Sequence, residues 1–160
     1  MRLPFCLAVS SLVLALHPTA SADLPTKRVL TLAAAKKIVQ AAEADAIRRG
    51  ATVVIAVVDE GGYPILLERL DDTQVASVEV AIGKARTAAI FRRPSKVFED
   101  QVREGRIAAL GLPGATPLQG GLPIVVEGKV VGAIGVSGNT PQEDEDIARA
   151  GLAATAQAIQ

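Results

Sequence analysis

The sequence has few of the side chains on which most enzyme active sites depend. Its 160 residues include one histidine, one cysteine, one methionine and no tryptophan. The three single residues are Met1, Cys6 and His17, all within the first 22 positions. Residues 23–160 therefore cannot form a Ser-His-Asp triad, a cysteine nucleophile, a disulfide or an ordinary zinc site. Most imidazole-based acid–base catalysis is excluded as well.

The first 22 residues have the pattern of an export signal. Arg2 supplies a positive charge, residues 3–16 are apolar, and an A-x-A cleavage site ends at Ala22. The apolar stretch is short for a membrane span, although a retained anchor is the alternative. We expect residues 1–22 to be a signal peptide and residues 23–160 to be a single domain. The mature protein should then be periplasmic or secreted, with no membrane span after processing.

Neither charge nor aromatic content indicates a nucleic-acid partner. Without Arg2, 16 basic residues stand against 17 acidic ones. This balance provides no basic field for phosphates, and one tyrosine with three phenylalanines provides no stacking platform. The alanine- and valine-rich remainder is apolar enough to indicate surface buried between subunits, so we expect a homo-oligomer.

The first half of the mature chain predicts helices and strands in alternation. Apolar residues at helical spacing run from Thr31 to a glycine stop at Gly50. Residues 52–58 are a continuous β-branched run, which indicates a strand covered on both faces. The next expected elements are a turn at 59–62, a strand at 63–70, a helix at 74–91 and a shorter helix at 95–102. The face of helix 74–91 expected to be buried holds Val75, Val78, Ile82, Ala85 and Ala89.

The second half predicts a loop, a hairpin and a final helix. Residues 105–121 hold five glycines and two prolines, and loops this long are more often functional than idle. Two β-branched runs, 124–126 and 130–136, flank a short Gly-containing connector that suits a hairpin. A capping box at Thr140 then begins a helix expected over 141–159.

Because the strands come in consecutive hairpins, the sequence predicts an α+β fold with a chiefly antiparallel sheet and packed helices. A short additional strand near Leu118 would give the sheet five strands.

Two glycine-rich patterns carry little chemistry. Gly132, Gly135 and Gly138 precede a helix but lack dinucleotide-loop spacing, and the strand before them belongs to a hairpin. Ser137 lies in the segment Gly135-Val136-Ser137-Gly138, which resembles a nucleophile elbow. The spacing of its glycines is wrong for that motif, and no histidine is available to activate the serine. The acidic run at 143–146 could hold a hard cation, but the helix dipole explains acids in a first turn adequately.

Tyr63 is the only tyrosine, and it follows Gly61-Gly62 at the base of a hairpin. A half-buried aromatic packed on the sheet edge is one interpretation. The other is a phenolate ligand to ferric haem, the role that tyrosine has in catalase.

Five segments in register resemble the GlcG/HbpS-like haem-binding (haem-degrading) family over nearly all of the mature chain. They are Asp59-x-Gly61-Gly62, Leu67-Glu-Arg69-Leu-Asp71, Lys84-Ala85-x-Thr87-Ala88-x-x-Phe91-x-x-Pro94-Ser95, Gly120-Gly121-Leu-Pro123-Ile124 and Gly132-Ala-Ile-Gly-Val-Ser-Gly138. The resemblance implies a profilin- or PAS-like three-layer sandwich and homo-oligomers, from dimers to octamers. It also implies haem or iron handling outside the cytoplasm for members with signal peptides.

The resemblance also indicates site residues, with two departures. Many members have histidine directly after the Gly-Gly pair, where this chain has Tyr63, and many read Asp-Gly where this chain has Asp71-Asp72. Tyr63 is therefore the natural substitute as axial ligand to haem iron. Candidate partners of the haem propionates are Arg69, Lys84 and Arg86, and the candidate pocket-lining residues are Thr116, Gly120 and Gly121. Solvated surface charges, or a local pair between Arg69 and Asp71, are the alternative for the three cations.

The first functional hypothesis is an exported oligomer that binds haem, more a binding protein than a catalyst. If haem is degraded, iron and an oxidant supply the reactivity and the protein supplies position. The second hypothesis is an enzyme or accessory protein for a small oxidised metabolite such as glycolate. There, Arg69 would hold a carboxylate and Asp59 or Asp71 would move a proton. A corrinoid-binding protein, or an oligomer with a purely structural role, is the third.

Overall fold

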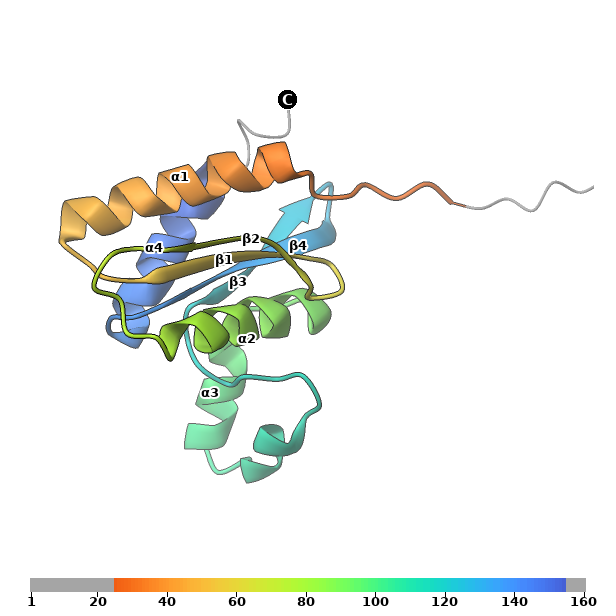
Figure 1. The fold of residues 1–160 in the computed structure, drawn as a ribbon. Helices are drawn as coiled ribbons and strands as arrows, with labels where there is room; N and C mark the ends of the chain where they lie inside the picture. Colours follow the sequence, from red (N-terminus) through yellow and green to blue (C-terminus); the bar gives the residue numbers. More distant parts are fainter. Residues whose placement is uncertain (1–24, 155–160) are drawn as a thin grey trace, which may run out of the picture.

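In the computed structural model, which describes residues 25–154, helices cover both faces of a single sheet (Figure 1). The elements are α1 (Leu32–Arg49), β1 (Val54–Asp59), β2 (Pro64–Arg69), α2 (Ser77–Ile90), α3 (Lys96–Arg103), the 3-10 helix η1 (Ile107–Gly111), β3 (Gly121–Val126), β4 (Lys129–Ser137) and α4 (Pro141–Ala153). The α+β class is confirmed. The predicted signal peptide at 1–22 and the expected end of the last helix at 155–159 lie outside the described residues.

The sheet has four strands in the order β2-β1-β4-β3, and every pair is antiparallel. The expectation of a fifth strand near Leu118 is wrong. The Ser95 side chain takes the backbone groups that such a strand would use, because its Oγ donates to the carbonyl of Leu118 (2.5 Å) and accepts from the Gly121 N–H (2.9 Å). Leu118 lies in the loop before β3 and is 44% exposed.

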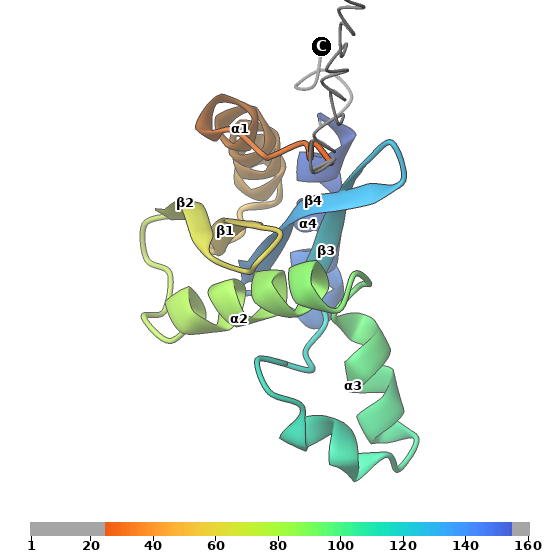
Figure 2. The same cartoon turned by 90° about the vertical axis from the view of Figure 1, so that its right-hand side faces the viewer.

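The two faces of the sheet are covered differently (Figure 2). Helices α1 and α4 pack on one face over a core of large aliphatic side chains that includes Ile38, Ile55, Ile134 and Ile147. Helix α2 packs on the other face through small side chains, namely Ala81, Ala85, Ala88 and Ala89.

The expected buried face of helix 74–91 is only partly correct. Ala85 and Ala89 are buried, but Val75 is 74% exposed and Ile82 is half-buried. The reason is Gly135 of β4, where an added Cβ would lie 2.5 Å from the Ala85 nitrogen and closer still to the Ala81 carbonyl oxygen. Because the helix backbone approaches the strand this closely, only small side chains fit between them.

The predicted capping box, glycine stop and hairpin connector are present. Thr140 and Glu143 form the capping box of α4, and Gly50 ends α1 in the left-handed region with φ 67°. Glu127 and Gly128 connect β3 to β4 with φ 50° and 75°, as in the two-residue turns that match hairpin twist. No helix within residues 25–154 is long and apolar enough to cross a membrane.

Candidate functional site

The structure brings three of the predicted site residues to one side of α2. Tyr63 ends the β1–β2 turn, Arg86 lies on α2, and Thr116 belongs to the long loop before β3. In Figure 1 this turn and this loop both lie near the C-terminal half of α2. The three residues come from segments separated by at least 20 positions in the chain, so only the fold places them together.

The β1–β2 turn fixes the backbone of Tyr63. The Asp59 carboxylate accepts hydrogen bonds from the N–H groups of Gly61 and Tyr63, both at 2.9 Å. The turn then rests on α2, where Arg86 Nε donates to the Gly62 carbonyl at 3.2 Å. A Cβ on Gly62 would lie 2.6 Å from Arg86 Cγ, and its φ is 83°, so glycine is required there by both space and conformation.

The Tyr63 side chain is available to a ligand. It is 68% exposed, and its hydroxyl makes no hydrogen bond within residues 25–154. The expectation of a half-buried aromatic on the sheet edge is therefore wrong. The terminal nitrogens of Arg86 likewise have no partner among the described residues. The surface thus presents a phenol and a guanidinium that share the same turn.

Thr116 anchors the loop on the outer side of α2. Thr87 Oγ1 accepts from the Thr116 N–H at 2.6 Å and donates to the Gly83 carbonyl at 2.8 Å. The Thr116 side chain contacts Gly83 so closely that a Cβ there would lie 3.1 Å from Thr116 Cβ and nearer still to its hydroxyl. Thr116 also borders a cavity of about 510 Å³ whose other walls are Glu99, Val102, Arg103, Leu110, Pro117 and Leu118.

Lys84 lies on the opposite, buried side of α2. Its Nζ donates to Asp144 Oδ2 at 2.7 Å and to the Val136 carbonyl at 2.9 Å, and the two charged side chains are 5% and 3% exposed. Burial raises the pKa of Asp144, and the ion pair with Lys84 opposes that rise. The alternative of a solvated surface charge is wrong for Lys84, and the pair leaves its ammonium facing protein groups.

Gly120 and Gly121 pack against the same lysine. A Cβ on Gly120 would lie 3.0 Å from Lys84 Nζ, and one on Gly121 would overlap the Lys84 carbonyl. Both glycines are buried, so they bring the end of the loop onto α2 and do not face a cavity.

Asp144 was missed because the acidic run at 143–146 has a sufficient explanation in the helix dipole. That explanation holds for Glu143, which completes the capping box. Asp144, however, shares the buried face of α4 with Ala148 and Gly151, at positions i, i+4 and i+7. An acidic residue at helical spacing from the other residues of a buried face is the sequence signal that could have identified Asp144.

Arg69 lies at the other end of β2 from Tyr63. It is exposed and pairs in register with Val54, whereas Tyr63 belongs to the turn before β2. At 3.3 Å per residue, six strand positions separate the two residues by about 20 Å.

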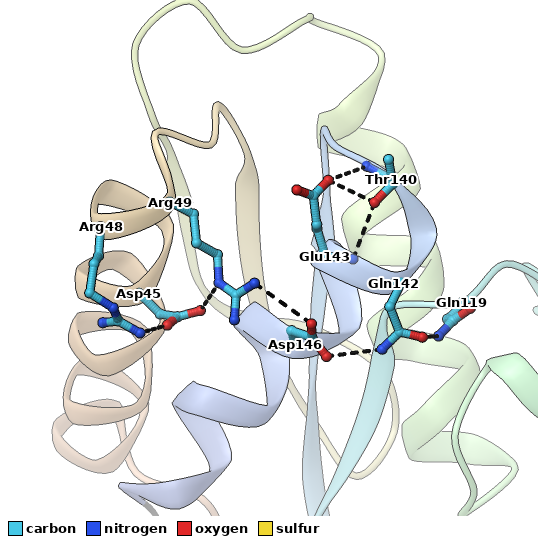
Figure 3. Close-up of polar contacts among 8 residues, drawn as sticks. All are labelled: Asp45, Arg48, Arg49, Gln119, Thr140, Gln142, Glu143 and Asp146. Carbon is cyan, nitrogen blue, oxygen red and sulfur yellow. Dashed lines mark hydrogen bonds and ion pairs between the residues drawn. The ribbon is translucent and has the colours of Figure 1, made fainter.

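A polar network holds the end of the loop against α4 (Figure 3). Gln119 Nε2 donates to Gln142 Oε1 at 3.1 Å, and Gln142 Nε2 donates to Asp146 Oδ1 at 2.9 Å. Arg49 connects this network to α1, since it pairs with both Asp146 (3.6 Å) and Asp45 (2.6 Å).

Within the described part of the chain, no group of three or more His, Cys, Asp or Glu side chains could hold a metal ion.

Comparisons with known proteins agree with this fold. Protein GlcG of Escherichia coli K12 is 40% identical over 114 residues, which cover 71% of this chain and 85% of GlcG. A double mutant of HbpS from Streptomyces reticuli has a crystal structure with a TM-score of 0.77 and 34% identity, covering 87% of this chain and 97% of that one. The PduOC:heme complex has a TM-score of 0.73 and 26% identity, over 79% of this chain and 95% of that one.

Residues 30–153 also match the model of the family described as "Haem degrading protein HbpS-like". That match covers more than half of the chain, and the GlcG identity extends over most of both proteins. The chain therefore belongs to the GlcG/HbpS-like family.

Proposed function

We propose that the protein is an exported, homo-oligomeric haem-binding protein whose haem site is the surface around Tyr63. The observation that carries the proposal is the exposed Tyr63 phenol, which has no hydrogen-bond partner among residues 25–154 and belongs to the turn that Arg86 contacts. Family membership and the haem complex of the relative PduOC support haem as the ligand class. The A-x-A pattern ending at Ala22 supports export, with a periplasmic or secreted product.

The residues present fit haem. Tyrosine is an established axial ligand of haem iron, and residues 23–160 offer no histidine, cysteine or methionine to compete with Tyr63. Arg86 uses Nε to hold the turn, which leaves its terminal nitrogens for a propionate. The partly exposed Ile90 side chain, and the mostly apolar cavity bordered by Thr116, offer contacts to an apolar macrocycle.

The other predicted contacts have weaker support. Lys84, Gly120 and Gly121 form a buried cluster with Asp144. We therefore assign these three residues a structural role and no contact with haem. Arg69 lies about 20 Å from Tyr63 along β2, at the opposite end of the strand, whereas Arg86 contacts the turn that carries Tyr63. The propionate partner in this proposal is therefore Arg86.

Bound haem would supply iron-centred redox chemistry, including any reaction that degrades the macrocycle. The chain's own residues would bind the haem and orient it. Asp59 fixes the turn that carries Tyr63, Arg86 supplies positive charge, and the Thr87–Thr116 contact holds the loop in place.

The test is a titration of the purified protein with ferric haem, followed by the Soret band. We expect a saturable shift with tyrosinate character, and we expect Tyr63→Phe to abolish that character. Arg86→Gln should weaken binding about two- to fivefold, the effect of losing one partly exposed ion pair. Lys36→Gln removes an exposed charge on α1 and is the matched control, expected to bind haem like the wild type.

The same titration separates the rival functions. Wild-type protein with no saturable Soret shift, or Tyr63→Phe with an unchanged spectrum, contradicts the proposal. Glycolate binding that is lost in Arg69→Ala would support the metabolite hypothesis, and binding of a cobalamin without haem binding would support the corrinoid alternative. Light scattering on eluted protein, with and without haem, gives the size of the oligomer.

A further inference from the structure

A second candidate binding site lies at the end of the sheet near the β3–β4 turn. A groove of about 920 Å³ is formed there by four separate segments, which we call the lead–hairpin groove. Its lining consists of Thr26, Lys27 and Arg28 ahead of α1, Glu60 in the β1–β2 turn, Arg92 after α2, and residues 125–131 of the hairpin. The volume is in the range of small-molecule sites, about 300–1,000 Å³. Tyr63 does not line this groove.

The groove combines an apolar wall with an excess of positive charge. Val125, Val126, Val130 and Val131 supply the wall. Lys27 pairs with Glu60, and Arg28 pairs with Glu127, so these four charges are already matched. The side chains of Arg92 and Lys129 have no hydrogen bond or ion pair to any residue within 25–154. Two cations are therefore left to meet an anion.

Backbone conformation provides an independent observation. Three non-glycine residues in the described chain have positive φ, and two of them, Arg92 (55°) and Glu127 (50°), line this groove. Arg92 directly follows Phe91, the C-cap of α2, where glycine would adopt the left-handed conformation without a Cβ penalty. The two-residue turn between β3 and β4 accounts for the positive φ of Glu127, so Arg92 is the groove residue whose strained backbone points to a binding site.

The two ion pairs hold the residues before α1 against the β1–β2 turn and the β3–β4 hairpin, and Figure 1 shows this segment at the same end of the sheet as the two turns. Both pairs are solvent-exposed, so each contributes little to stability and weakens with salt. The groove keeps its excess of two positive charges while Lys27 and Arg28 hold Glu60 and Glu127.

From these observations we propose that the lead–hairpin groove binds a small organic anion, a carboxylate on an apolar body, with Arg92 and Lys129 as its counter-charges. The valine wall contacts the apolar body. This site shares the β1–β2 turn with the Tyr63 surface through Glu60, but Tyr63, Arg86 and Thr116 do not line it, and it does not depend on haem binding.

The test uses two matched probes, 3-phenylpropionate and 3-phenylpropan-1-ol, which differ in charge at one end. Amide chemical shifts in two-dimensional NMR should move saturably with the acid at Arg92 and along residues 125–131. The alcohol should bind about four- to twenty-five-fold more weakly, because it lacks the charge that pairs with two cations. Arg92→Gln and Lys129→Gln should each weaken binding of the acid about two- to fivefold.

Two controls decide the outcome. Lys36→Gln removes a cation from α1, outside the groove, and Tyr63→Phe alters the proposed haem site; both should bind 3-phenylpropionate like the wild type. Equal binding of acid and alcohol, equal loss in Lys36→Gln, or shifts confined to other residues would overturn the proposal. Since Tyr63→Phe is expected to lose haem and keep the acid, failure of one site is distinguishable from failure of the other.

Discussion

The two faces of the sheet are stabilised in different ways. The face under α1 and α4 is filled by large side chains, such as Ile38, Ile55 and Ile147, that are fully buried. The face under α2 holds alanines and glycines, and the helix backbone itself contacts the strands at Gly121 and Gly135. The only buried ion pair between elements in the described chain joins Lys84 of α2 to Asp144 at the start of α4.

This difference determines how each face tolerates change. Where side chains fill the space, losing a methyl group costs transfer free energy and a small cavity, and neighbours relax to share the loss. Where backbones are in contact, an added methyl group has no neighbouring side chain to displace, so an element must move. We therefore expect the α2 face to be the less tolerant of the two. Because the Tyr63 turn and the Thr116 loop rest on α2, changes on this face should also disturb the candidate haem site.

The largest expected effect is at the buried ion pair. Lys84→Met removes the ammonium and leaves the Asp144 carboxylate buried, with the backbone N–H groups of Gly138 and Asn139 as its polar partners in the described residues. Removing one partner of a buried pair typically costs about 3–5 kcal/mol. Urea unfolding at pH 7 measures the loss.

The pH dependence of this variant supplies a check. Burial already raises the pKa of Asp144, and losing Lys84 raises it further. A carboxyl whose folded pKa is raised stabilises the protein at pH values below its unfolded pKa and loses that contribution as pH rises through the folded value. The deficit of Lys84→Met should therefore shrink on acidification. Lys84→Met combined with Asp144→Leu should recover much of the stability, and a double variant as unstable as the single one would contradict the ion-pair explanation.

The next largest effect comes from adding a methyl group on the α2 face, and we compare it with removing a methyl group from the other face. Gly135→Ala adds a methyl group that would overlap the α2 backbone, and we expect it to destabilise the protein by about 3 kcal/mol. Ile147→Val removes a methyl group from the other face and should cost about 1 kcal/mol. Gly111→Ala is the control for adding a methyl group, because nothing lies within 4 Å of that position. Equal losses for Gly135→Ala and Ile147→Val, measured by urea unfolding, would remove the distinction between the faces.

The elements of the fold could be predicted because their signals are local. The expected strand at 52–58 became Val54–Asp59, and the expected helix at 31–50 became Leu32–Arg49. β-Branched runs, a capping box and a glycine stop each act within a few residues of the chain. The buried face of α2 was only partly predicted, because it depends on a glycine in β4 that is distant in sequence.

The candidate site was harder to predict for the same reason. Tyr63 could be identified because it is the only tyrosine, and its proximity to Arg86 follows from the way the turn rests on α2. Lys84 could not be distinguished from Arg86 in sequence, yet the two lie on opposite sides of the helix. The partner of Lys84 is 60 residues away, and no local pattern connects them.

The smallest expected effect lies at the margin of the more tolerant face. Glu68 of β2 is opposite Ile55, and its carboxyl is close to Glu43 of α1. Partial burial raises the pKa of Glu68 above its ordinary value of 4.5, and the neighbouring Glu43 raises it further. The stability that protonated Glu68 contributes is present below pH 4.5 and is lost as pH rises through the folded pKa. Glu68→Gln should therefore stabilise the protein by ~0.5 kcal/mol at pH 7 and by nothing at pH 4.

Thermal unfolding of Glu68→Gln across pH 4–8 measures this gain, and Glu104→Gln, which removes an exposed carboxylate after α3, is the matched control. Glu43→Gln should give a similar gain, because either substitution removes the repulsion between the two carboxylates. The double variant should then gain less than the sum of the two single gains, since the same repulsion cannot be removed twice. Additive gains would show that the two carboxylates act independently. Solvent exposure alone would then explain why this margin of the α1 and α4 face tolerates substitution.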